Sequence, residues 1–371
     1  MNARIKPIVM PKWGLSMSEG KLTGWLKPAG TKIAVGDEIV EVETDKIAGV
    51  VEAGDAGTLR RLLGVPDTIY PVKSLIGVIA EDDVPDAEID AFVAGYAAEA
   101  AETEDGETTV PLYQFVDTPA GRLRYAKRGD HDRTIILIHG FGGDLDNWLF
   151  NIDALAETGT VYALDLPGHG QSAKTVQEPS LAGLSAALLG FMQALGIEQA
   201  HLVGHSLGGA VAARIALDQP DRVASITLIG SAGLGEEINA SYTDGFVAAN
   251  SRRELKPVLE QLFHDPANVT RQLVDDLLKY KRIDGVDAAL RALGGALFAA
   301  GRQSQVLAEA LRDNATPVLV IWGESDQVIP AAHATALGDT AKTEVIADAG
   351  HMVQMEKASR VNELVRDHVT G

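Results

Sequence analysis

A serine flanked by glycines stands where the sequence predicts a sharp turn from a buried strand into a helix. The pentapeptide GHSLG, residues 204–208, follows the apolar run AHLV and precedes the helical pattern GAVAARIALD. A G-x-S-x-G turn in this context holds the serine hydroxyl out of the sheet, beside a helix N-terminus whose partial positive charge favours an oxyanion. The pattern therefore predicts that Ser206 is a nucleophile.

A serine hydroxyl is a poor nucleophile at neutral pH, so it needs a base that a third group orients. The chain order expected for this turn is serine, then acid, then histidine. Asp326 lies in the loop after the apolar run VLVIWG, and His351 precedes the terminal helical segment. We therefore assign His351 as general base and acid and Asp326 as its orienter, with Glu324 and Asp348 as the alternative acids.

Acyl chemistry at a serine also requires two backbone N–H groups that stabilise the oxyanion. We expect one from Leu207, after the nucleophile, and the other from Phe141 in the glycine-rich loop HGFGG. We expect His139 and Gly140 to shape this loop, and His169 to be a structural loop residue. The nine histidines show no metal-binding spacing such as H-E-x-x-H, so we predict no metal site.

The elements that must position these residues alternate along the C-terminal part of the chain. Near-continuous apolar runs such as RTIILIHG and VASITLIG alternate with helical patterns such as SLAGLSAALLGFMQALG. This order is typical of a parallel sheet covered by helices on both faces. In such sheets the chemistry lies at the carboxyl ends of the strands, where the candidate residues fall.

These motifs resemble the α/β-hydrolase family over residues 115–370. The resemblance implies that the helical segment from Ser231 to about Ala310 forms a cap that roofs the site and sets acyl-group specificity. The apolar stripes of this segment could equally be ordinary helix packing, and the two interpretations are compatible.

The N-terminal 82 residues contain an internal repeat. Shifted by 37 positions, GKLTGWLKPAGTKIAVGDEIVEV overlays GTLRRLLGVPDTIYPVKSLIGVI. Both halves alternate apolar and polar residues between turn residues, which predicts two half-units packed as a small β-sandwich. Asp45 and Lys46 fall in the hairpin between the halves, so we expect Lys46 to be exposed on a protrusion.

Residues 5–82 resemble the lipoyl domains of 2-oxo-acid dehydrogenase complexes. The resemblance rests on the stretches MPKWGLSMSEGKLTGWL, GDEIVEVETDKIAGVVEA and AGTL. It implies that lipoic acid is attached to Lys46 through an amide bond. Biotin carrier domains share the fold, but their lysine usually sits between methionines. Here Asp45 and Ile47 flank the lysine, which favours the lipoyl group.

Acidic residues dominate the segment between the two parts. Residues 81–107 contain eleven Asp or Glu and no Lys or Arg. Such a segment buries little apolar surface, so we expect a solvated, extended linker with at most one short helix around residues 86–100. The predicted organisation is a lipoyl domain over 1–82, an acidic linker over 83–112 and a hydrolase domain over 113–371.

The composition excludes several classes of function. The chain has no cysteine, which excludes disulfides and thiolate metal sites. Its net charge of −20 argues against partners such as nucleic acid or an anionic membrane. There is no uncharged apolar stretch of about 18 residues and no apolar signal-peptide core at the start, so we expect a cytoplasmic protein.

Together the two parts resemble the dihydrolipoamide acetyltransferase components of acetoin dehydrogenase complexes. The resemblance implies transfer of an acetyl group from the lipoyl group on Lys46 to coenzyme A through Ser206. It implies two partners, a thiamine-diphosphate-dependent acetoin dehydrogenase component and a dihydrolipoamide dehydrogenase, and we expect a homo-oligomer. Two alternatives stay open. One is a hydrolase of esters, thioesters or carbon–carbon bonds that carries the lipoyl domain for location, and the other is a scaffold with an idle hydrolase domain.

Overall fold

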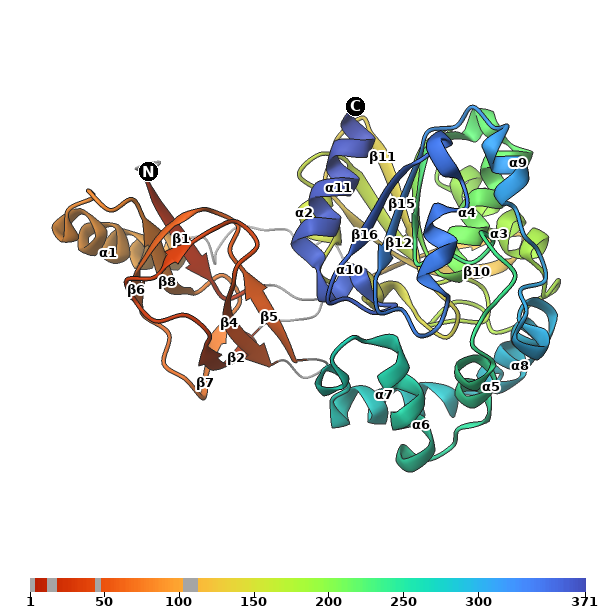
Figure 1. Ribbon diagram of the computed structural model, residues 1–371, viewed down its shortest axis with the longest axis horizontal. Helices are drawn as coiled ribbons and strands as arrows, with labels where there is room; N and C mark the ends of the chain where they lie inside the picture. Colours follow the sequence, from red (N-terminus) through yellow and green to blue (C-terminus); the bar gives the residue numbers. More distant parts are fainter. Residues whose placement is uncertain (1–3, 12–18, 44–47, 103–112) are drawn as a thin grey trace. The chain divides into compact units, whose positions relative to one another are not determined.

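The computed structural model describes residues 4–11, 19–43, 48–102 and 113–371. The chain forms two compact units, Met1–Pro111 and Leu112–Gly371 (Figure 1). The smaller unit is built from strands with one helix, and the larger unit combines strands and helices in alternation.

Two four-stranded antiparallel sheets form the smaller unit, with the orders β1-β8-β6-β3 and β5-β4-β2-β7. The strands are β1 (Ile5–Val9), β2 (Glu19–Trp25), β3 (Lys32–Ile33), β4 (Glu38–Glu43), β5 (Ala48–Glu52), β6 (Gly57–Leu62), β7 (Thr68–Pro71) and β8 (Leu75–Ala80). The sequence repeat is visible in the core, because the matched pairs Leu22 and Leu59, and Ile39 and Ile76, are all buried. The predicted β-sandwich is therefore confirmed.

Strands β4 and β5 are neighbours that pair antiparallel, and the last pair of the ladder joins Glu43 to Ala48. Residues 44–47 connect these two strands, and Lys46 lies outside the residues that the structure describes. Its exposure on a protrusion therefore stays a prediction.

The acidic segment contains the helix that we expected around residues 86–100, but this helix packs on the sandwich instead of being solvated. The helix, α1 (Asp86–Glu102), has 17 residues, and its Ile89 is fully buried against the sandwich together with Ile5 and Val78. Arg61 of β6 forms ion pairs with two acidic residues of the helix. Helix α1 therefore has an apolar face despite its acidic composition. Cationic side chains of the sandwich offset part of the negative charge of this helix.

The larger unit contains one eight-stranded sheet with the order β16-β15-β14-β13-β11-β12-β10-β9. Its strands are β9 (Gln114–Thr118), β10 (Gly121–Arg128), β11 (Thr134–Ile138), β12 (Thr160–Leu164), β13 (Ala200–His205), β14 (Val223–Ile229), β15 (Val318–Gly323) and β16 (Lys342–Ile346). Strands β11 to β16 pair in parallel, whereas β9 and β10 add an antiparallel edge. The predicted parallel sheet is confirmed, and every residue of β15 is buried.

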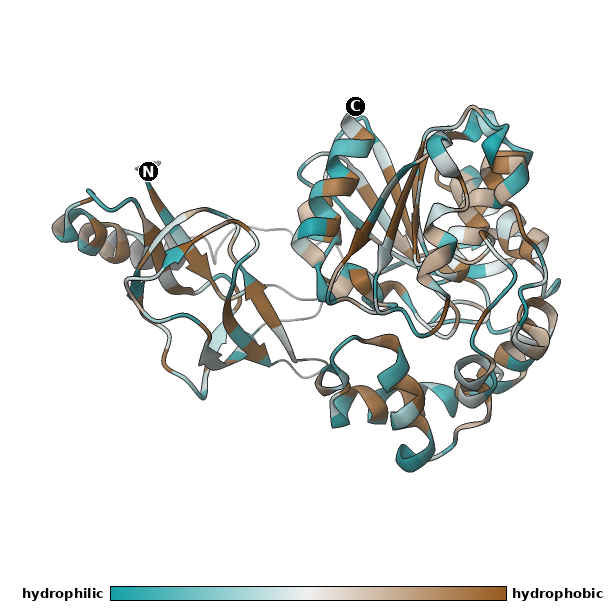
Figure 2. Ribbon diagram, viewed as in Figure 1, coloured by the Kyte–Doolittle hydropathy of each residue, from teal (hydrophilic) through white to brown (hydrophobic). Residues whose placement is uncertain are grey.

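Helices cover both faces of this sheet. Figure 1 shows α2 (Ile152–Leu155) and α11 (Ala358–Thr370) on one face and α3 (Leu181–Ala194) and α4 (Leu207–Asp218) on the other. The hydrophobic strands lie between these layers and form the core (Figure 2). None of the described helices has the length and apolar character needed to cross a bilayer.

A group of helices is inserted between β14 and β15, in the segment where we expected a cap. It contains α5 (Ala240–Ala248), α6 (Arg252–Leu259), α7 (Arg271–Lys281), α8 (Val286–Leu297) and α9 (Ala308–Arg312). Helices α5 to α8 pack on one another at the carboxyl-end side of the sheet, while α9 contacts α4 (Figure 1). The inserted group, here called the cap, therefore lies at the edge of the sheet that carries the candidate residues.

Candidate active site

Ser206 occupies the turn between β13 and α4 in a strained backbone conformation, with φ 54° and ψ −117°. The turn is possible because glycines surround it. A Cβ atom on Gly204 would lie 2.2 Å from the backbone oxygen of Gly208, and one on Gly208 would lie 2.1 Å from the backbone oxygen of Ile138. The predicted order of strand, serine and helix is therefore present, with the serine at the helix N-terminus.

His351 lies between β16 and α10 (Val353–Glu356), and Asp326 lies in the loop after β15. Nδ1 of His351 donates a hydrogen bond to Oδ2 of Asp326 at 2.8 Å, and both side chains are buried. Oδ1 of the same carboxylate accepts hydrogen bonds from the N–H groups of Val328 and Ile329 at 2.8 and 3.0 Å. The carboxylate thus fixes the imidazole with Nε2 as its basic nitrogen.

The two alternative acids do not occupy this position. Glu324 is exposed, and the side chain of Asp348 is 78% exposed and lies 3.8 Å from Nε2 of His264. Of the three candidate acids, Asp326 is the one that the fold brings to His351.

Backbone and ring contacts bring His351 to the turn that holds Ser206. Nε2 of His205 donates to the carbonyl oxygen of His351 at 3.0 Å, and the two ring centroids are 4.7 Å apart. The N–H of Ser206 donates to the carbonyl of Ile229 at 2.9 Å, and a Cβ atom on the next residue, Gly230, would lie 3.2 Å from Nδ1 of His351. These contacts place Ser206, His351 and Asp326 at the carboxyl ends of neighbouring strands.

His205 is a site residue whose contact the sequence did not predict. It occupies a variable position of the serine motif, and no local pattern links it to the loop that follows β16. It is 3% exposed, and burial, followed by the proximity of His351, holds its pKa well below the ordinary value for histidine. A neutral His205 that donates through Nε2 positions the backbone of His351.

The two residues expected to stabilise the oxyanion both lie beside Ser206. Leu207 is the first residue of α4, where a backbone N–H has no acceptor within the helix. The loop that carries Phe141 passes directly against the serine, because a Cβ atom on Gly140 would lie 3.0 Å from Cβ of Ser206. This arrangement suits two N–H donors for a developing oxyanion.

His139 holds this loop in place. The N–H of Leu166 donates to Nε2 of His139 at 3.0 Å, so Nδ1 is the protonated nitrogen and donates to the carbonyl of Gly140 at 2.7 Å. Burial lowers the pKa of His139, which keeps this neutral tautomer. The shaping role expected for His139 agrees with these contacts.

Aromatic side chains of the cap cover the same loop. The ring of Phe141 packs edge-on against Phe246 and Phe298, with centroids 6.1 and 5.7 Å apart. The N–H of Asn239, the residue before α5, donates to the carbonyl of Val328 at 2.8 Å, so the cap also contacts the loop of Asp326. The cap therefore lies over both the oxyanion loop and the acid.

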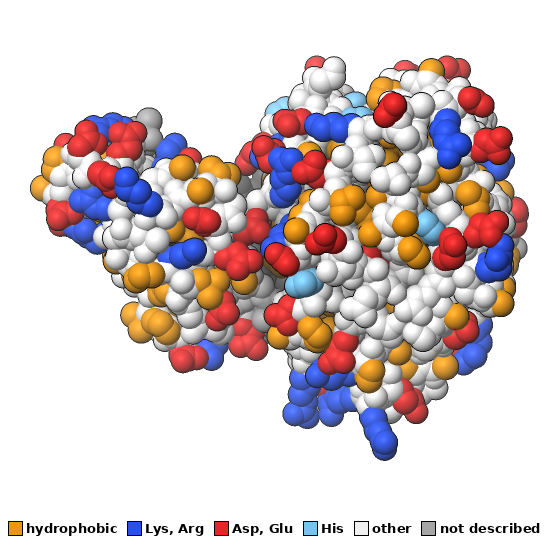
Figure 3. Space-filling view, viewed as in Figure 1, with side chains coloured by type: hydrophobic (Ala, Val, Ile, Leu, Met, Phe, Trp, Pro, Cys, Tyr) orange, Lys and Arg blue, Asp and Glu red, His pale blue; other side chains and the backbone are white. Residues whose placement is uncertain are grey.

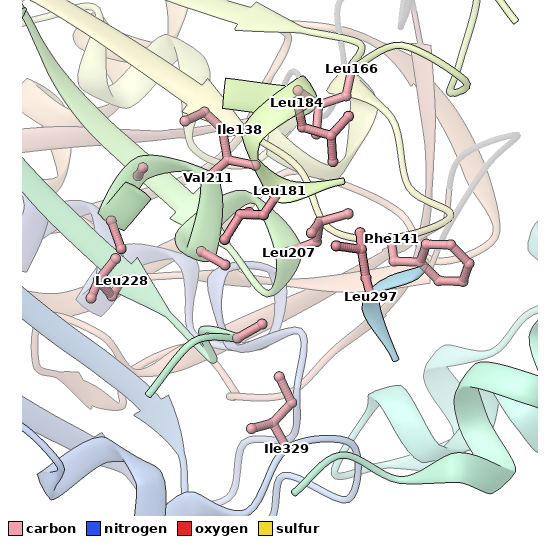
Figure 4. Packing of buried hydrophobic residues seen from close by; sticks show 14 of the residues in the cluster. Ile138, Phe141, Leu166, Leu181, Leu184, Leu207, Val211, Leu228, Leu297 and Ile329 are labelled. Atoms are coloured by element: carbon pink, nitrogen blue, oxygen red, sulfur yellow. The ribbon is translucent and has the colours of Figure 1, made fainter. Parts of the chain in front are cut away.

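A small pocket borders Leu207 under the cap. Leu207 and Ala210 of α4 form one wall, and Leu297 and Phe298 of the cap form another. Figure 4 shows Leu207 and Leu297 facing each other near Phe141. Gln305 adds an amide group to the lining. Within the described ranges, no group of three or more His, Cys, Asp or Glu could hold a metal ion.

His169 is a buried structural residue of a neighbouring loop, as expected. Its Nδ1 donates to the carbonyl of Pro167 at 3.1 Å, and its ring centroid lies 4.9 Å from that of His139. Burial lowers the pKa of His169 to about 3, from an ordinary value of 6.5.

This low pKa predicts an acid-sensitive fold. Between about pH 3 and 6.5 the unfolded chain binds a proton at His169 that the folded chain does not, so the free energy of unfolding falls as the pH is lowered through this window. From pH 6.5 to 5, His169 should account for about 2 kcal/mol of the fall in the free energy of unfolding. Urea unfolding of a His169→Gln variant should show a correspondingly smaller fall, whereas a variant of the exposed His131, His131→Gln, should match the parent. If the free energy of unfolding fell equally in the parent and both variants, the low pKa of His169 would be contradicted.

Both units match known families. Residues 133–358 match the model of the alpha/beta hydrolase fold, and residues 6–78 match the model described as biotin-requiring enzyme. Among solved structures, a meta-cleavage product hydrolase from Pseudomonas fluorescens is 26% identical with a TM-score of 0.64, and the match covers 69% of this chain and 97% of that one. A 2-hydroxy-6-oxo-6-phenylhexa-2,4-dienoate hydrolase from a Rhodococcus species is 25% identical with a TM-score of 0.63, covering 71% and 100%.

Two curated relatives match almost the full length of the chain. A dihydrolipoyllysine-residue acetyltransferase component of the acetoin cleaving system from Cupriavidus necator is 54% identical over 99% of this chain and 98% of its own length. The protein of the same description from Pseudomonas putida is 49% identical over 97% of both chains. The chain therefore belongs to the family of dihydrolipoyllysine-residue acetyltransferase components of acetoin cleaving systems.

Proposed function

We propose that the larger unit moves an acetyl group from a lipoyl-lysine to coenzyme A through an acetyl ester on Ser206. The observation that carries this proposal is the buried hydrogen bond between His351 and Asp326. This pair lies with the strained Ser206 at the carboxyl ends of the strands. This constellation performs acyl transfer in many folds. The near-full-length relatives support acetyl as the acyl group.

Lys46 would hold the lipoyl group. It belongs to the connection between Glu43 and Ala48, which are paired at the end of β4 and β5 in a small all-β unit. A side chain on such a connection suits a covalent tether better than one within a strand. When bound, the lipoyl group supplies the acetyl thioester that the larger unit consumes.

The chain's own residues then carry out two half-reactions. Nε2 of His351 removes the proton of Ser206, whose oxygen attacks the thioester carbonyl, and the N–H groups of Leu207 and Phe141 stabilise the oxyanion. His351 returns the proton to the departing thiol, while Asp326 stabilises the imidazolium. In the second half-reaction the thiol of coenzyme A attacks the serine ester, and the same groups act in reverse.

Transfer to a thiol requires that water be kept from the ester. The aromatic contacts of Phe246 and Phe298 with Phe141 support such exclusion. The cap also carries cations in a chain whose net charge is −20, and Lys and Arg gather over α6 and α7 in Figure 3. Several of these cations are paired with carboxylates of the cap, such as Arg252 with Asp275 and Lys279 with Asp276. The exposed Arg253 and Arg271 would attract the phosphates of coenzyme A to this face.

Two partner proteins would complete the cycle. A thiamine-diphosphate-dependent component would load the arm on Lys46 with acetyl, and a dihydrolipoamide dehydrogenase would reoxidise the arm. The place of the relatives in an acetoin cleaving system supports such partners, and we propose that the chain acts as a homo-oligomer.

Hydrolysis is the competing reaction. The solved structures of similar fold include hydrolases at 26 and 25% identity, and the same three residues would serve water as the acceptor. In that case the arm would serve only to locate the enzyme within a complex.

A Lys46→Arg variant tests the delivery of the acyl group. Arginine cannot carry the amide-linked lipoyl group, so acetyl transfer from the arm to coenzyme A should fall to background. Acylation of Ser206 by the small ester p-nitrophenyl acetate should stay within about twofold of the parent, because the catalytic groups are untouched. Lys73 is an exposed turn lysine of the same unit, so Lys73→Arg is the matched control. Normal transfer by Lys46→Arg would refute the proposed tether.

A further inference from the structure

We propose that Glu356 is a positioning residue whose carboxylate ties the loop that carries His351 to the cap, so that the cap helps to hold the general base in place. This inference rests on the proposed function, because it assigns a role in Ser206 acylation. It concerns a side chain that the chemical steps above do not use.

The contacts of Glu356 join two segments that are far apart in the sequence. Oε2 accepts a hydrogen bond from the N–H of Gly350 at 2.7 Å, and Oε1 accepts one from the N–H of His264 at 2.8 Å. Gly350 directly precedes His351, and His264 lies in the cap between α6 and α7. One carboxylate therefore clamps the backbone of the base to the backbone of the cap.

Two further observations place these segments in direct contact. The N–H of Met352 donates to the carbonyl of Leu262 at 3.0 Å, so the residue after His351 is also bonded to the cap. A Cβ atom on Gly350 would lie 2.7 Å from the backbone nitrogen of His264. The two backbones pack against each other with no room for a side chain.

In the described part of the chain, the carboxylate of Glu356 is stabilised by hydrogen bonds and not by a cationic side chain. Glu356 is half-buried, and burial raises its pKa, while the backbone N–H groups and His264 act in the opposite direction. Within the described residues it forms no ion pair with Lys or Arg. A partly buried carboxylate without a cationic partner is costly, and backbone N–H donors compensate for that cost here.

His351 is therefore held from three sides. Asp326 fixes Nδ1, His205 donates to the carbonyl oxygen, and Glu356 accepts from the preceding N–H group. Loss of the third contact would leave the base present but less well aligned with Ser206. A small misplacement of a catalytic group slows the chemical step more than it weakens substrate binding.

A Glu356→Gln variant tests the clamp, because glutamine keeps the shape but offers one carbonyl oxygen, and its NH₂ group faces an N–H donor. The rate constant for Ser206 acylation by p-nitrophenyl acetate should fall about ten- to hundredfold, with the KM within about twofold of the parent. Amide hydrogen exchange at Gly350 and His264 should become faster. Glu363 of α11 binds Arg360 at the surface, so Glu363→Gln should change neither quantity.

A second variant removes the donor on the cap side and leaves Glu356 in place. Phe263 has φ −118° and ψ 148°, a conformation that a following proline favours, so His264→Pro is a feasible substitution. It should lower the acylation rate in the same way. An unchanged acylation rate in either folded variant, or a raised KM with an unchanged rate, would overturn the proposal. Persistent acylation in a parallel Ser206→Ala protein would instead refute the site assignment itself.

Discussion

Replacing Ser206 with alanine is expected to lower acetyl transfer to coenzyme A by at least about 10⁴-fold. The reason is that Ser206, in the strained turn between β13 and α4, is the hydroxyl that this turn presents beside the loop of His351. Transfer is measured as acetyl-coenzyme A formed from acetylated, lipoylated protein. Mass analysis should show that the variant is still lipoylated, since the change lies in the other unit.

The control for this prediction is Ser251→Ala, which changes an exposed serine before α6 and should leave transfer within about twofold of the parent. A Ser206→Ala protein that still forms acetyl-coenzyme A at the parent rate would mean that the larger unit is a scaffold and that the chemistry occurs elsewhere.

Asp326→Asn is expected to lower the rate of Ser206 acylation by about 10³–10⁴-fold without unfolding the protein. The carbonyl oxygen of the asparagine can still accept from the N–H groups of Val328 and Ile329, which places its NH₂ group toward His351. Nδ1 would then have to accept rather than donate, so Nε2 would carry the proton and could not act as the base. Stopped-flow acylation by p-nitrophenyl acetate measures the effect.

The alternative acid serves as the matched control. Asp348 lies three residues before His351, but its side chain is 78% exposed. Asp348→Asn should therefore keep the acylation rate within about threefold of the parent. If Asp348→Asn were as slow as Asp326→Asn, the orienter would be misassigned.

Features with a local signature could be predicted from the sequence. The glycines around Ser206 predict a turn that only small residues allow. In the structure, nearby backbone atoms leave no room for a Cβ atom at these glycines. The order of apolar strands and helices fixes a parallel sheet, and the carboxyl ends of parallel strands share one edge. For this reason Asp326 and His351 could be paired with the serine across more than a hundred residues.

Features that depend on contacts between distant segments could not be predicted. The sequence predicts a helix around residues 86–100 but not its burial, because Ile89 is buried only through its contact with the sandwich. Likewise, Glu356 is an ordinary helix residue in the sequence, and its partner on the cap lies 92 positions away. His205 contacts a backbone carbonyl 146 positions away. No periodicity or motif records such pairings.

The measurement that bears most directly on the proposed chemistry follows the acetyl group itself. Fully acetyl-lipoylated protein is incubated with and without coenzyme A, and the masses of the peptides that contain Lys46 and Ser206 are recorded over time. We predict acetyl on Ser206 when the acceptor is absent, and its rapid conversion to acetyl-coenzyme A when the thiol is added. An arm that discharges with Ser206 never modified, or a serine ester that goes to water at the same rate with or without the thiol, would contradict the account.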